Sequence, residues 1–469
     1  MKLKLVVASM SVLGLVSCPV FADTDTKHKH HHHHHKMVKH HHHVRHHEEM
    51  VEHHDYKDMG ALPVVEAACT ISQTTMILDG TTQSMGRAMP NPCNPGWFNR
   101  LQFSGGLNVD LGKWGNRNTG YMGENMQRLS LNDAYLNMAA TVNDWARAFV
   151  SLSYNTATIV PDGTGYITHK AAGEYSAAYS NNVQSLTANN TLQLEQAYAT
   201  LGNFDVSPIY VQVGKQFQDF SRYEIHSMTR SMTQVMSETL ATSAKIGFIV
   251  PMGFHGSVFA FDDPVPKIGQ TSKPTNYGVA LGFDQPNDQL GWDIGAAYLY
   301  NLIGANDVAY SVQNFTSDGG YNTRVGAVAL YGDVNSGPFT LGARWTTAVQ
   351  RFNALDLPKH GVADFAGVFP AGVSKTATGA KPWAAGIQAG YGFDAWGKNQ
   401  NVYLGYQASR ESAGMDLPKS RWLVGYGIDM WKYTNFGVEW DHDMAYSVAN
   451  GGTNNNTNLV SLRAGVKFG

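Results

Sequence analysis

Charged residues are scarce in this chain of 469 residues. Asp, Glu, Lys and Arg make up 15% of it, against about 25% in soluble globular proteins, which argues against a soluble multidomain enzyme. A basic excess is also missing, because 34 Lys and Arg face 37 Asp and Glu. A generic nucleic-acid-binding protein is therefore not expected. Mean hydropathy is -0.27, and the chain lacks the series of apolar runs of about 20 residues that a polytopic helical membrane protein needs.

Glycine and aromatic residues are plentiful instead. The chain holds 48 Gly and 22 Tyr, and aromatic residues make up 11% of it. Low charge without long apolar runs is typical of a chain whose apolar residues alternate with small polar ones. Because a transmembrane β-barrel presents apolar side chains to lipid and polar ones to its lumen, the composition predicts that all-β, antiparallel fold.

The first 22 residues resemble a secretory signal peptide. Lys2 and Lys4 form the charged end, residues 5–16 the apolar stretch, and residues 20–22 an A-x-A-like cleavage site. An anchoring helix is disfavoured because the apolar run is only about 12 residues long. We therefore predict that residues 1–22 are removed on export.

Cysteine usage bears on how this signal is processed. Residues 15–18 resemble a lipoprotein processing box, which would make Cys18 a lipidation site. Conventional cleavage is favoured, since it leaves only Cys69 and Cys93, an even pair in an exported and therefore oxidising setting. We expect these two cysteines to form a disulfide within a linker over residues 61–98.

Residues 23–60 form a low-complexity segment rich in histidine, and we expect it to be disordered because it cannot bury a core. Of the 20 histidines in the chain, 15 lie between His28 and His54. Neutral imidazole is a common ligand for zinc, copper and nickel, so the segment is a candidate for metal capture. A slipped codon repeat or a purification tag would also explain it. The candidate metal ligands are His30, His31, His32, His33, His34, His35, His40, His41, His42, His43, His46, His47, His53 and His54.

From residue 99 to residue 469 apolar and polar residues alternate in segments of roughly ten residues. In the last segment Val460 and Leu462 alternate with Ser461 and Arg463, so one set would face lipid and the other a wet lumen. The predicted strands cover residues 99–111, 127–140, 145–155, 190–202, 208–216, 243–250, 254–261, 276–284, 291–300, 322–332, 337–350, 382–393, 401–410, 420–430, 435–446 and 458–468.

The number of segments and the lengths of their connections specify the architecture. Sixteen is an even number, as bacterial outer-membrane barrels have. Short connections such as 141–144 and 251–253 recur between longer ones such as 156–189 and 217–242. Short periplasmic turns alternating with long outer loops are the barrel arrangement, which puts both ends of the barrel, and the His-rich segment, in the periplasm.

Aromatic residues near the strand ends are expected to form the interfacial girdles of the barrel. A packed apolar core is not expected inside a barrel of this size. The expected girdle residues are Trp145, Tyr154, Trp292, Tyr298, Tyr300, Trp345, Trp422, Trp431, Trp440 and Tyr446.

Enzymatic motifs are missing from the sequence. It contains no phosphate-binding glycine loop, HExxH, GxSxG or paired-cysteine motif. Asp441, His442 and Asp443 could bind a cation, but a solvated histidine is the simpler interpretation. We therefore predict no enzymatic activity and no required cofactor.

The third long connection, residues 217–242, is the most informative one. In sixteen-stranded general porins the loop at this position folds inward and narrows the pore, and this analogy of position favours an inward loop over an external one. Its mixed charges could form a transverse field that selects a polar solute. The candidate constriction residues are Lys215, Asp219, Arg222, Glu224, His226, Arg230 and Glu238.

Basic residues predicted to face the lumen are few and mixed with acidic ones, so strongly one-sided charge selectivity is not predicted. These basic residues are Lys215, Lys245, Arg324, Arg344, Arg410, Arg463 and Lys467.

Several stretches of the barrel resemble the LbtU-type family of siderophore porins, outer-membrane proteins of Legionella-like and Francisella-like bacteria. The first three are LEQAYATLG at 194–202, YVQVGKQF at 210–217 and MTQVMSET at 232–239. LNDAYLN at 131–137 and GWDIGAAY at 291–298 are also similar to that family.

This resemblance covers about residues 97–469. It implies a sixteen-stranded barrel that imports ferric siderophore or iron without the plug domain of energised receptors. The expected partners are outer-membrane lipid and a siderophore or small polar solute, in an oligomeric state that is not predicted. The family carries a short coiled-coil-like segment where this chain has its His-rich one, so the cargo could instead be another metal. A general diffusion porin with an incidental His tract and a structural or adhesive surface barrel are also compatible with the sequence.

Overall fold

The computed structural model describes residues 101–115, 125–154, 192–222, 227–270, 273–285, 290–315, 320–361, 364 and 377–468. The chain divides into two compact units, Met1–His53 and His54–Gly469, and all described residues belong to the second. The expected signal peptide, the His-rich segment and the predicted Cys69–Cys93 disulfide lie outside the described residues.

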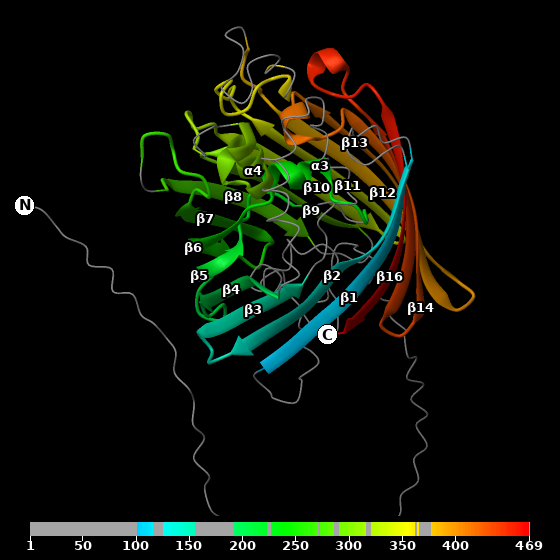
Figure 1. Cartoon of the computed structure of the whole chain (residues 1–469). Coiled ribbons are helices and arrows are strands. Elements are labelled where there is room, and N and C mark those ends of the chain that lie inside the picture. Colours follow the sequence, from blue (N-terminus) through cyan, green and yellow to red (C-terminus); the bar gives the residue numbers. More distant parts are fainter. Residues whose placement is uncertain are drawn as a thin grey trace, which may run out of the picture. The chain divides into compact units, whose positions relative to one another are not determined.

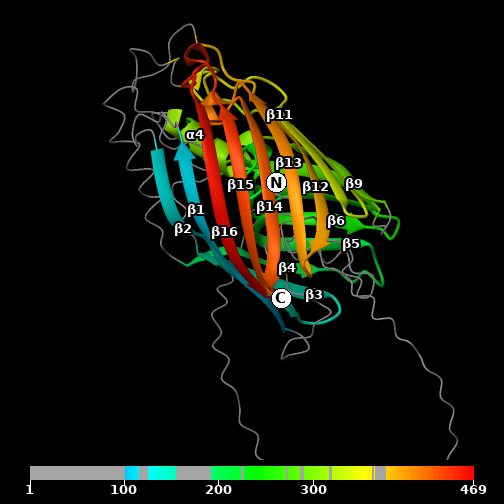
Figure 2. The same ribbon diagram turned by 90° about the vertical axis from the view of Figure 1, so that its right-hand side faces the viewer.

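Sixteen strands close into one antiparallel barrel, in which each strand pairs with its neighbours in the sequence and β1 pairs with β16 (Figures 1 and 2). The predicted fold class is therefore confirmed. The strands are β1 (Leu101–Gly115), β2 (Asn125–Thr141), β3 (Ala146–Tyr154), β4 (Gln193–Leu201), β5 (Ile209–Phe217), β6 (Leu240–Ile249), β7 (Phe254–Asp262), β8 (Thr275–Gln285), β9 (Gly291–Leu299), β10 (Ala327–Ser336), β11 (Phe339–Ala348), β12 (Trp383–Ala395), β13 (Lys398–Arg410), β14 (Ser420–Trp431), β15 (Thr434–Met444) and β16 (Asn456–Phe468).

All sixteen predicted strands correspond to observed ones, and most ends agree within a few residues. The largest difference is at β10, which begins at Ala327 rather than residue 322 and continues through the predicted turn 333–336 to Ser336. The turn to β11 is instead made by Gly337 and Pro338, with Gly337 at φ +53°. Glycine tolerates that left-handed conformation without steric cost, so the chain reverses there in two residues.

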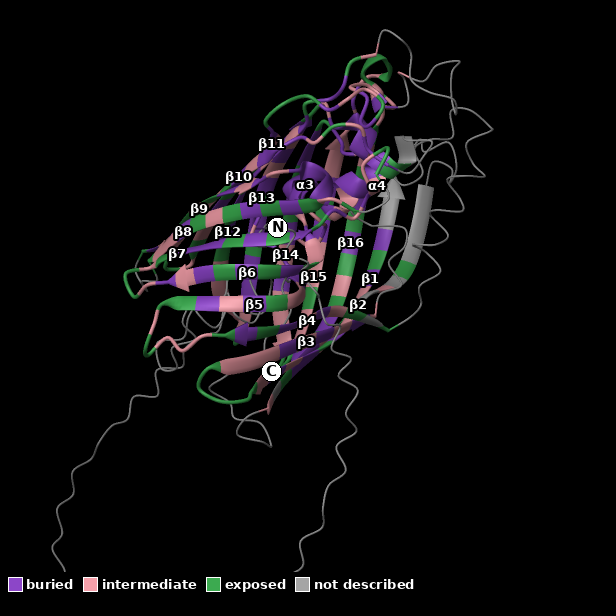
Figure 3. Ribbon diagram, turned by 90° about the vertical axis from the view of Figure 1, so that its left-hand side faces the viewer, coloured by how far each residue is buried: buried purple, intermediate pink, exposed green. Residues whose placement is uncertain are grey.

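Burial alternates along the strands with period two (Figure 3). In β16, Val460, Leu462 and Val466 are exposed, whereas Ser461 and Lys467 are buried. Because neighbouring residues of a strand point to opposite faces, the exposed apolar set lies on the outside of the barrel and the polar set inside. An outer surface of exposed Leu, Val and Ile is what a barrel in lipid requires.

Glycines opposite inward-facing rings account for part of the high Gly and Tyr content. Tyr403 on β13 pairs directly with Gly425 on β14, and a Cβ added to Gly425 would collide with the Tyr403 ring. Tyr331 on β10 has the same relation to Gly295 on β9. In each pair the missing side chain lets the ring lie flat across the neighbouring strand.

Helices among the described residues are short and lie in the long connections. They are α3 (Met232–Ser237), η3 (Leu302–Gly304), α4 (Asn306–Phe315), η5 (Ala413–Met415) and η6 (Val448–Asn450). No helix in this part of the chain has the length and apolarity needed to cross a membrane.

A packed apolar core lies inside the barrel, so the expectation that none would form is wrong. Loop residues such as Met236 and Ile303 are fully buried in one cluster with Phe259, Ala327 and Ala348 of the strands. The inward-facing alanines of the wall leave room for loop side chains, and burying apolar surface in this way stabilises loops that point inward.

Several of the residues expected in the aromatic girdle face outward, and one does not. Trp345, Trp422 and Trp440 are exposed on outward-facing positions of their strands. Tyr446, however, is 9% exposed and its hydroxyl lies 2.7 Å from the Ser409 hydroxyl. Tyr446 therefore belongs to the buried loop packing and is not a girdle residue.

The pair of Tyr403 and Gly425 generates a stability prediction. We expect Gly425→Ala to lower the free energy of unfolding by about 1–3 kcal/mol, because the new methyl group has to displace the Tyr403 ring from a filled position. The measurement is the unfolding midpoint, followed as the heat-dependent shift in gel mobility. Gly332→Ala is the control: its Cβ would meet only Ile294, at 3.6 Å. Equal midpoints for the two variants would contradict the prediction.

Candidate functional site

The connection between β5 and β6 folds into the barrel along its inner wall. Gln218 donates a hydrogen bond from Nε2 to the Ser243 hydroxyl at 2.9 Å. One residue on, Asp219 forms an ion pair with Lys245 at 2.8 Å and accepts a hydrogen bond from the Ser257 hydroxyl at 2.6 Å. Since the three partners face inward on β6 and β7, the chain is held below the rim of the barrel.

The carboxyl group of Asp219 is held in its ionised form. Burial raises its pKa, but the nearby Lys245 ammonium and the hydrogen bonds from Lys245 and Ser257 outweigh burial, and the pKa is lowered overall. Lys245 is only 2% exposed, so the pair forms a fixed, neutral unit rather than a solvated one.

Arg222 continues the loop at the wall formed by β7 to β10. Its guanidinium lies 2.7 Å from the Asp293 carboxylate and 4.9 Å from the centre of the Tyr331 ring. Burial lowers the pKa of Arg222, but Asp293 and the other acidic groups nearby raise it overall, so this arginine stays charged. His255 Nε2 and the Tyr331 hydroxyl are 3.5 Å apart.

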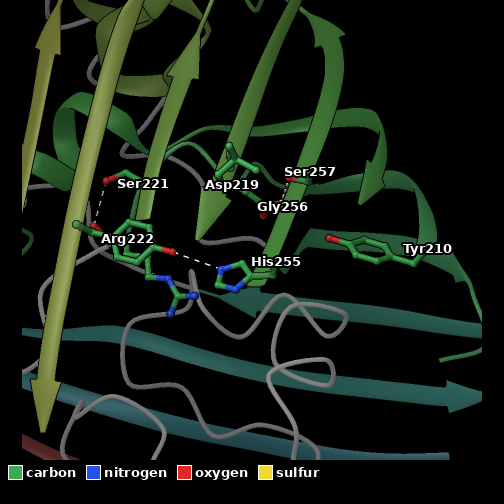
Figure 4. Close-up of a pocket in the computed structure, with 10 residues that line it drawn as sticks. Tyr210, Asp219, Ser221, Arg222, His255, Gly256 and Ser257 are labelled. Atoms are coloured by element: carbon green, nitrogen blue, oxygen red, sulfur yellow. Dashed lines mark hydrogen bonds between the residues drawn. The ribbon is translucent and has the colours of Figure 1, made fainter. Parts of the chain in front are cut away.

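These groups line a small cavity of about 40 Å³ between the loop and the wall. Figure 4 shows Arg222 and His255 on one side of this space and Asp219 beside Ser257 on the other. Every cation here has an acidic partner, so the cavity presents dipoles and paired charges rather than an excess of either sign.

The returning part of the loop lies against the opposite wall. The backbone N–H groups of Met228 and Thr229 donate to the two carboxylate oxygens of Glu439, at 2.7 and 2.9 Å. Arg463 donates to the Met228 carbonyl at 3.0 Å, and Arg421 donates to the Arg230 carbonyl at 3.1 Å.

This second contact shows that the loop crosses the lumen. Glu439 lies on β15 and Arg421 on β14, whereas the loop is attached to β5 and β6. In a closed ring of sixteen strands, β14 is eight strands away from β6, half of the circumference. The loop therefore bridges the barrel from one wall to the other.

Tyr403 supports the anchor on this far wall. Its hydroxyl donates to Glu439 at 2.8 Å, and its ring reaches Glu439 by lying across Gly425. The Glu439 carboxylate thus accepts three hydrogen bonds, which satisfies a buried charge without a cation.

After the crossing, the loop returns through α3. The Ser231 hydroxyl caps the helix by accepting from Gln234 N, and Met232 N donates to Gln407 Oε1 at 2.9 Å. Arg230 joins the helix to α4 through Asp307, at 2.6 Å, and also lies 3.4 Å from Glu238. Burial raises the pKa of Glu238; the Arg230 guanidinium opposes this effect and Asp307 adds to it.

The predicted constriction residues fall in different places. Asp219 and Arg222 lie on the β6–β10 wall, whereas Arg230 and Glu238 lie beside α3 and α4. Lys215 is on the outward row of β5 with Val213, and its ammonium donates to the Leu194 carbonyl. The other two predicted residues, Glu224 and His226, lie outside the described residues.

The basic residues predicted to face the lumen also fall in different places. Lys245, Arg344, Arg463 and Lys467 are on inward rows of their strands. Arg410 is on the outward row of β13, where it is exposed, and Lys215 is on the outward row of β5, so the lumen assignment of both residues is wrong.

Arg324 is also misassigned. It lies in the connection before β10 with its guanidinium 5.3 Å from the centre of the Tyr300 ring, so it does not line the barrel wall.

The residues missed from sequence are those that receive the loop. Arg421 and Glu439 are inward-facing wall residues, and only their parity within each predicted strand could have identified them. His442 is outward-facing and lies 2.9 Å from the Asn458 side chain. It therefore forms no site with Asp441 and Asp443, and no group of three or more His, Cys, Asp or Glu in the described part of the chain is placed to hold a metal ion.

The sequence is similar to curated proteins of two bacterial genera. A UPF0422 protein of Coxiella burnetii is 23% identical over 330 residues, which cover 70% of this chain and 61% of that protein. A UPF0422 protein of Legionella pneumophila strain Lens is 24% identical over 367 residues, covering 72% and 62%. The chain thus spans about three fifths of the length of these relatives, and no protein-family model matches it.

Solved structures similar to this one are porins and channels. Pseudomonas putida OprB aligns with a TM-score of 0.50 and 11% identity, over 79% of this chain and 94% of that one. The outer-membrane channel DcaP of Acinetobacter baumannii aligns with a TM-score of 0.49 and 12% identity, over 78% and 97%. The similarity to OprB supports the barrel fold.

The buried pair of Asp219 and Lys245 can be tested by substitution. Asp219→Asn leaves an ammonium without its counter-ion, and removing one partner of a buried pair costs about 3–5 kcal/mol. We therefore expect a lower unfolding midpoint and faster proteolysis of the loop, both partly restored by adding Lys245→Met. Because the pKa of Asp219 is lowered on folding, the ion pair of the wild type contributes to the free energy of unfolding at any pH above the unfolded-state pKa of Asp219. This contribution is lost as the pH falls through the folded-state pKa. Asp205→Asn, at an exposed turn position, is the control; an equal effect there would refute the role of the pair.

Proposed function

We propose that this protein is an outer-membrane channel for the uptake of iron–siderophore or a related metal chelate. The observation that carries the channel proposal is the loop that crosses the lumen from the Asp219 contacts to the Glu439 contacts. A loop held at both walls divides the cross-section of the barrel and sets its narrowest region. Narrowing by an inward loop is how a wide barrel discriminates between solutes.

The membrane location follows from the barrel itself. Every strand is paired on both sides, so no strand edge is left unpaired in the ring. A closed ring with an apolar outer surface is the form in which strands can cross hydrocarbon, where an unpaired backbone group costs several kcal/mol. Such barrels belong to the bacterial outer membrane.

The proposed orientation follows from the loop lengths. Turns such as 250–253 and 337–338 are short, and connections such as 300–326 are long. Short turns face the periplasm in outer-membrane barrels, and both ends of the barrel, Leu101 and Phe468, lie on that side because the strand number is even. The His-rich segment that precedes the barrel would then be periplasmic, where it would retain incoming or stray zinc, copper or nickel.

A metal chelate as solute is supported by the chemistry of the lumen and by the sequence resemblance. The inward wall offers paired charges of both signs, such as Arg344 with Asp333 at 2.8 Å, together with amides such as Gln212 and Gln388. A polar solute with several donors and acceptors can exchange hydrogen bonds along such a wall. The barrel also resembles siderophore porins, and curated relatives come from Legionella and Coxiella.

A general diffusion porin is the second candidate, favoured by the fold of OprB. An adhesive barrel is the third, and the apolar packing of its loops inside the barrel is the observation in its favour. The three differ in conductance: a chelate channel is open and is blocked by its solute, a general porin is open and unblocked, and an adhesive barrel does not conduct.

Planar-bilayer recordings separate these functions. We expect the purified full chain to form open channels whose current falls in a saturable manner as a ferric siderophore is added, because a bound solute occupies the narrowest region. The apo-siderophore and an uncharged sugar of similar size are the controls. Open channels with no saturable block would refute the chelate proposal, and an absence of current would refute the channel.

Metal capture by the His-rich segment requires a separate measurement. We expect deletion of residues 28–54 to remove most of the zinc, copper and nickel bound by the purified protein, because imidazole is the main ligand that this segment offers. Equilibrium dialysis of the two proteins measures the stoichiometry. A protein in which Lys replaces each His of the segment is the control for its length and charge. Equal stoichiometry with and without the segment would remove the metal proposal.

A further inference from the structure

Asp441 on β15 is the one acidic residue at the loop anchor that has no counter-ion of its own among the described residues, because the Arg421 guanidinium that attracts it is hydrogen-bonded to Asp443. Asp441 is 1% exposed and neither of its carboxylate oxygens accepts a hydrogen bond of ordinary geometry, although the side chain of Thr229 approaches it. Its cross-strand neighbours are Leu423 and Leu459, which are also buried and inward-facing. An ionised carboxylate between two leucines, without donors, is strongly disfavoured.

The neighbouring acidic residues do not stabilise an ionised Asp441. Glu439 and Asp443 lie two residues away on the same inward row of β15, so Asp441 has an acidic group on either side along its strand. Both of these carboxylates find their hydrogen-bond donors without Asp441. Glu439 accepts hydrogen bonds from the loop and from Tyr403. Asp443 accepts two hydrogen bonds from Arg421, at 2.6 and 2.9 Å.

The arginines on the adjacent strands are already engaged. Arg421 on β14 holds Asp443 and the Arg230 carbonyl. Arg463 on β16 holds Asp110 on β1, at 2.8 and 2.7 Å, and the Met228 carbonyl. Among the described side chains around the anchor, four carboxylates therefore face two guanidinium groups. The four are Asp110, Glu439, Asp441 and Asp443.

From these contacts we propose that Asp441 binds a proton as its counter-cation, and that this cation keeps the loop tip closed on the β13–β16 wall. The site itself does not depend on the proposed channel function. Its consequence, the control of conductance, rests on that function. With the cation bound, the row Glu439, Asp441 and Asp443 carries one charge less.

Without the cation, Asp441 repels Glu439 and competes with Asp443 for Arg421. Water must then enter to solvate the carboxylate, and Met228 and Thr229 cover that position. Loss of the cation therefore loosens the hydrogen bonds that hold the loop tip, and the lumen widens at its narrowest point.

Asp441→Asn tests the site because the amide has the shape of the carboxyl group and no charge. We expect the wild-type channel to pass more current as the pH rises, because the carboxyl group of Asp441 then loses its proton. A single titrating group changes the ratio of released to closed loop by at most about tenfold per pH unit. Asp441→Asn should stay at the low-conductance level throughout, and Asp205→Asn should respond as the wild type does.

A chelator at fixed pH is the control for metal ions. A pH response of the wild type that persists in chelator and is lost in Asp441→Asn supports the site, and a response that chelator abolishes would overturn it. Identical responses of wild type and Asp441→Asn, or no response in either, would overturn it.

Hydrogen exchange of the Met228 and Thr229 amides, corrected for the intrinsic effect of pH, measures loop release directly and applies even if no current is seen. Exchange that quickens in the wild type and not in Asp441→Asn supports the site, and equal exchange in the two proteins overturns it. Glu439→Gln, which weakens the anchor itself, should quicken this exchange under all conditions.

Discussion

Closure of the strand ladder is the constraint on which the rest of this structure depends. With β1 paired to β16, no backbone edge remains open, and sixteen strands must share one ring. This fixes the alternation of side chains, apolar outside and polar inside. It also fixes which residues can meet across the lumen, since β6 and β14 stand half of the ring apart. The loop between β5 and β6 can contact both walls only because the ring fixes the separation between them.

Most of the fold could be predicted from sequence because its signal is local. Alternation such as that of Val460 to Phe468 is contained in one strand, and a turn such as the one between β6 and β7 needs only its own residues. Errors arose where a strand continued through polar residues, as in β10 up to Ser336. The apolar loop core was missed because Met236 and Ile303 are far apart in the sequence and become neighbours only when both loops turn inward.

The candidate site was predicted less well, for the same physical reason. Asp219 and Arg222 were identified from their charges within the loop, but their partners could not be. The bond from Met228 to Glu439 joins residues 211 positions apart, and no local pattern encodes that separation. Lys215 shows the converse difficulty, because a basic residue in a strand looks the same in sequence whether it faces in or out.

The loop tip can dock on the barrel wall only late in the assembly of the chain. The loop tip is made of residues 227–231. The surface of the wall on which it docks is formed by Tyr403, Arg421, Glu439 and Arg463. Synthesis from the N-terminus completes the tip about 230 residues before the last of these partners exists. Until β16 joins β1, the tip has no wall to dock on. Completing the ring and docking the loop tip are therefore one late event in the assembly of the chain, and a half-assembled barrel also lacks the loop contacts that cross its lumen.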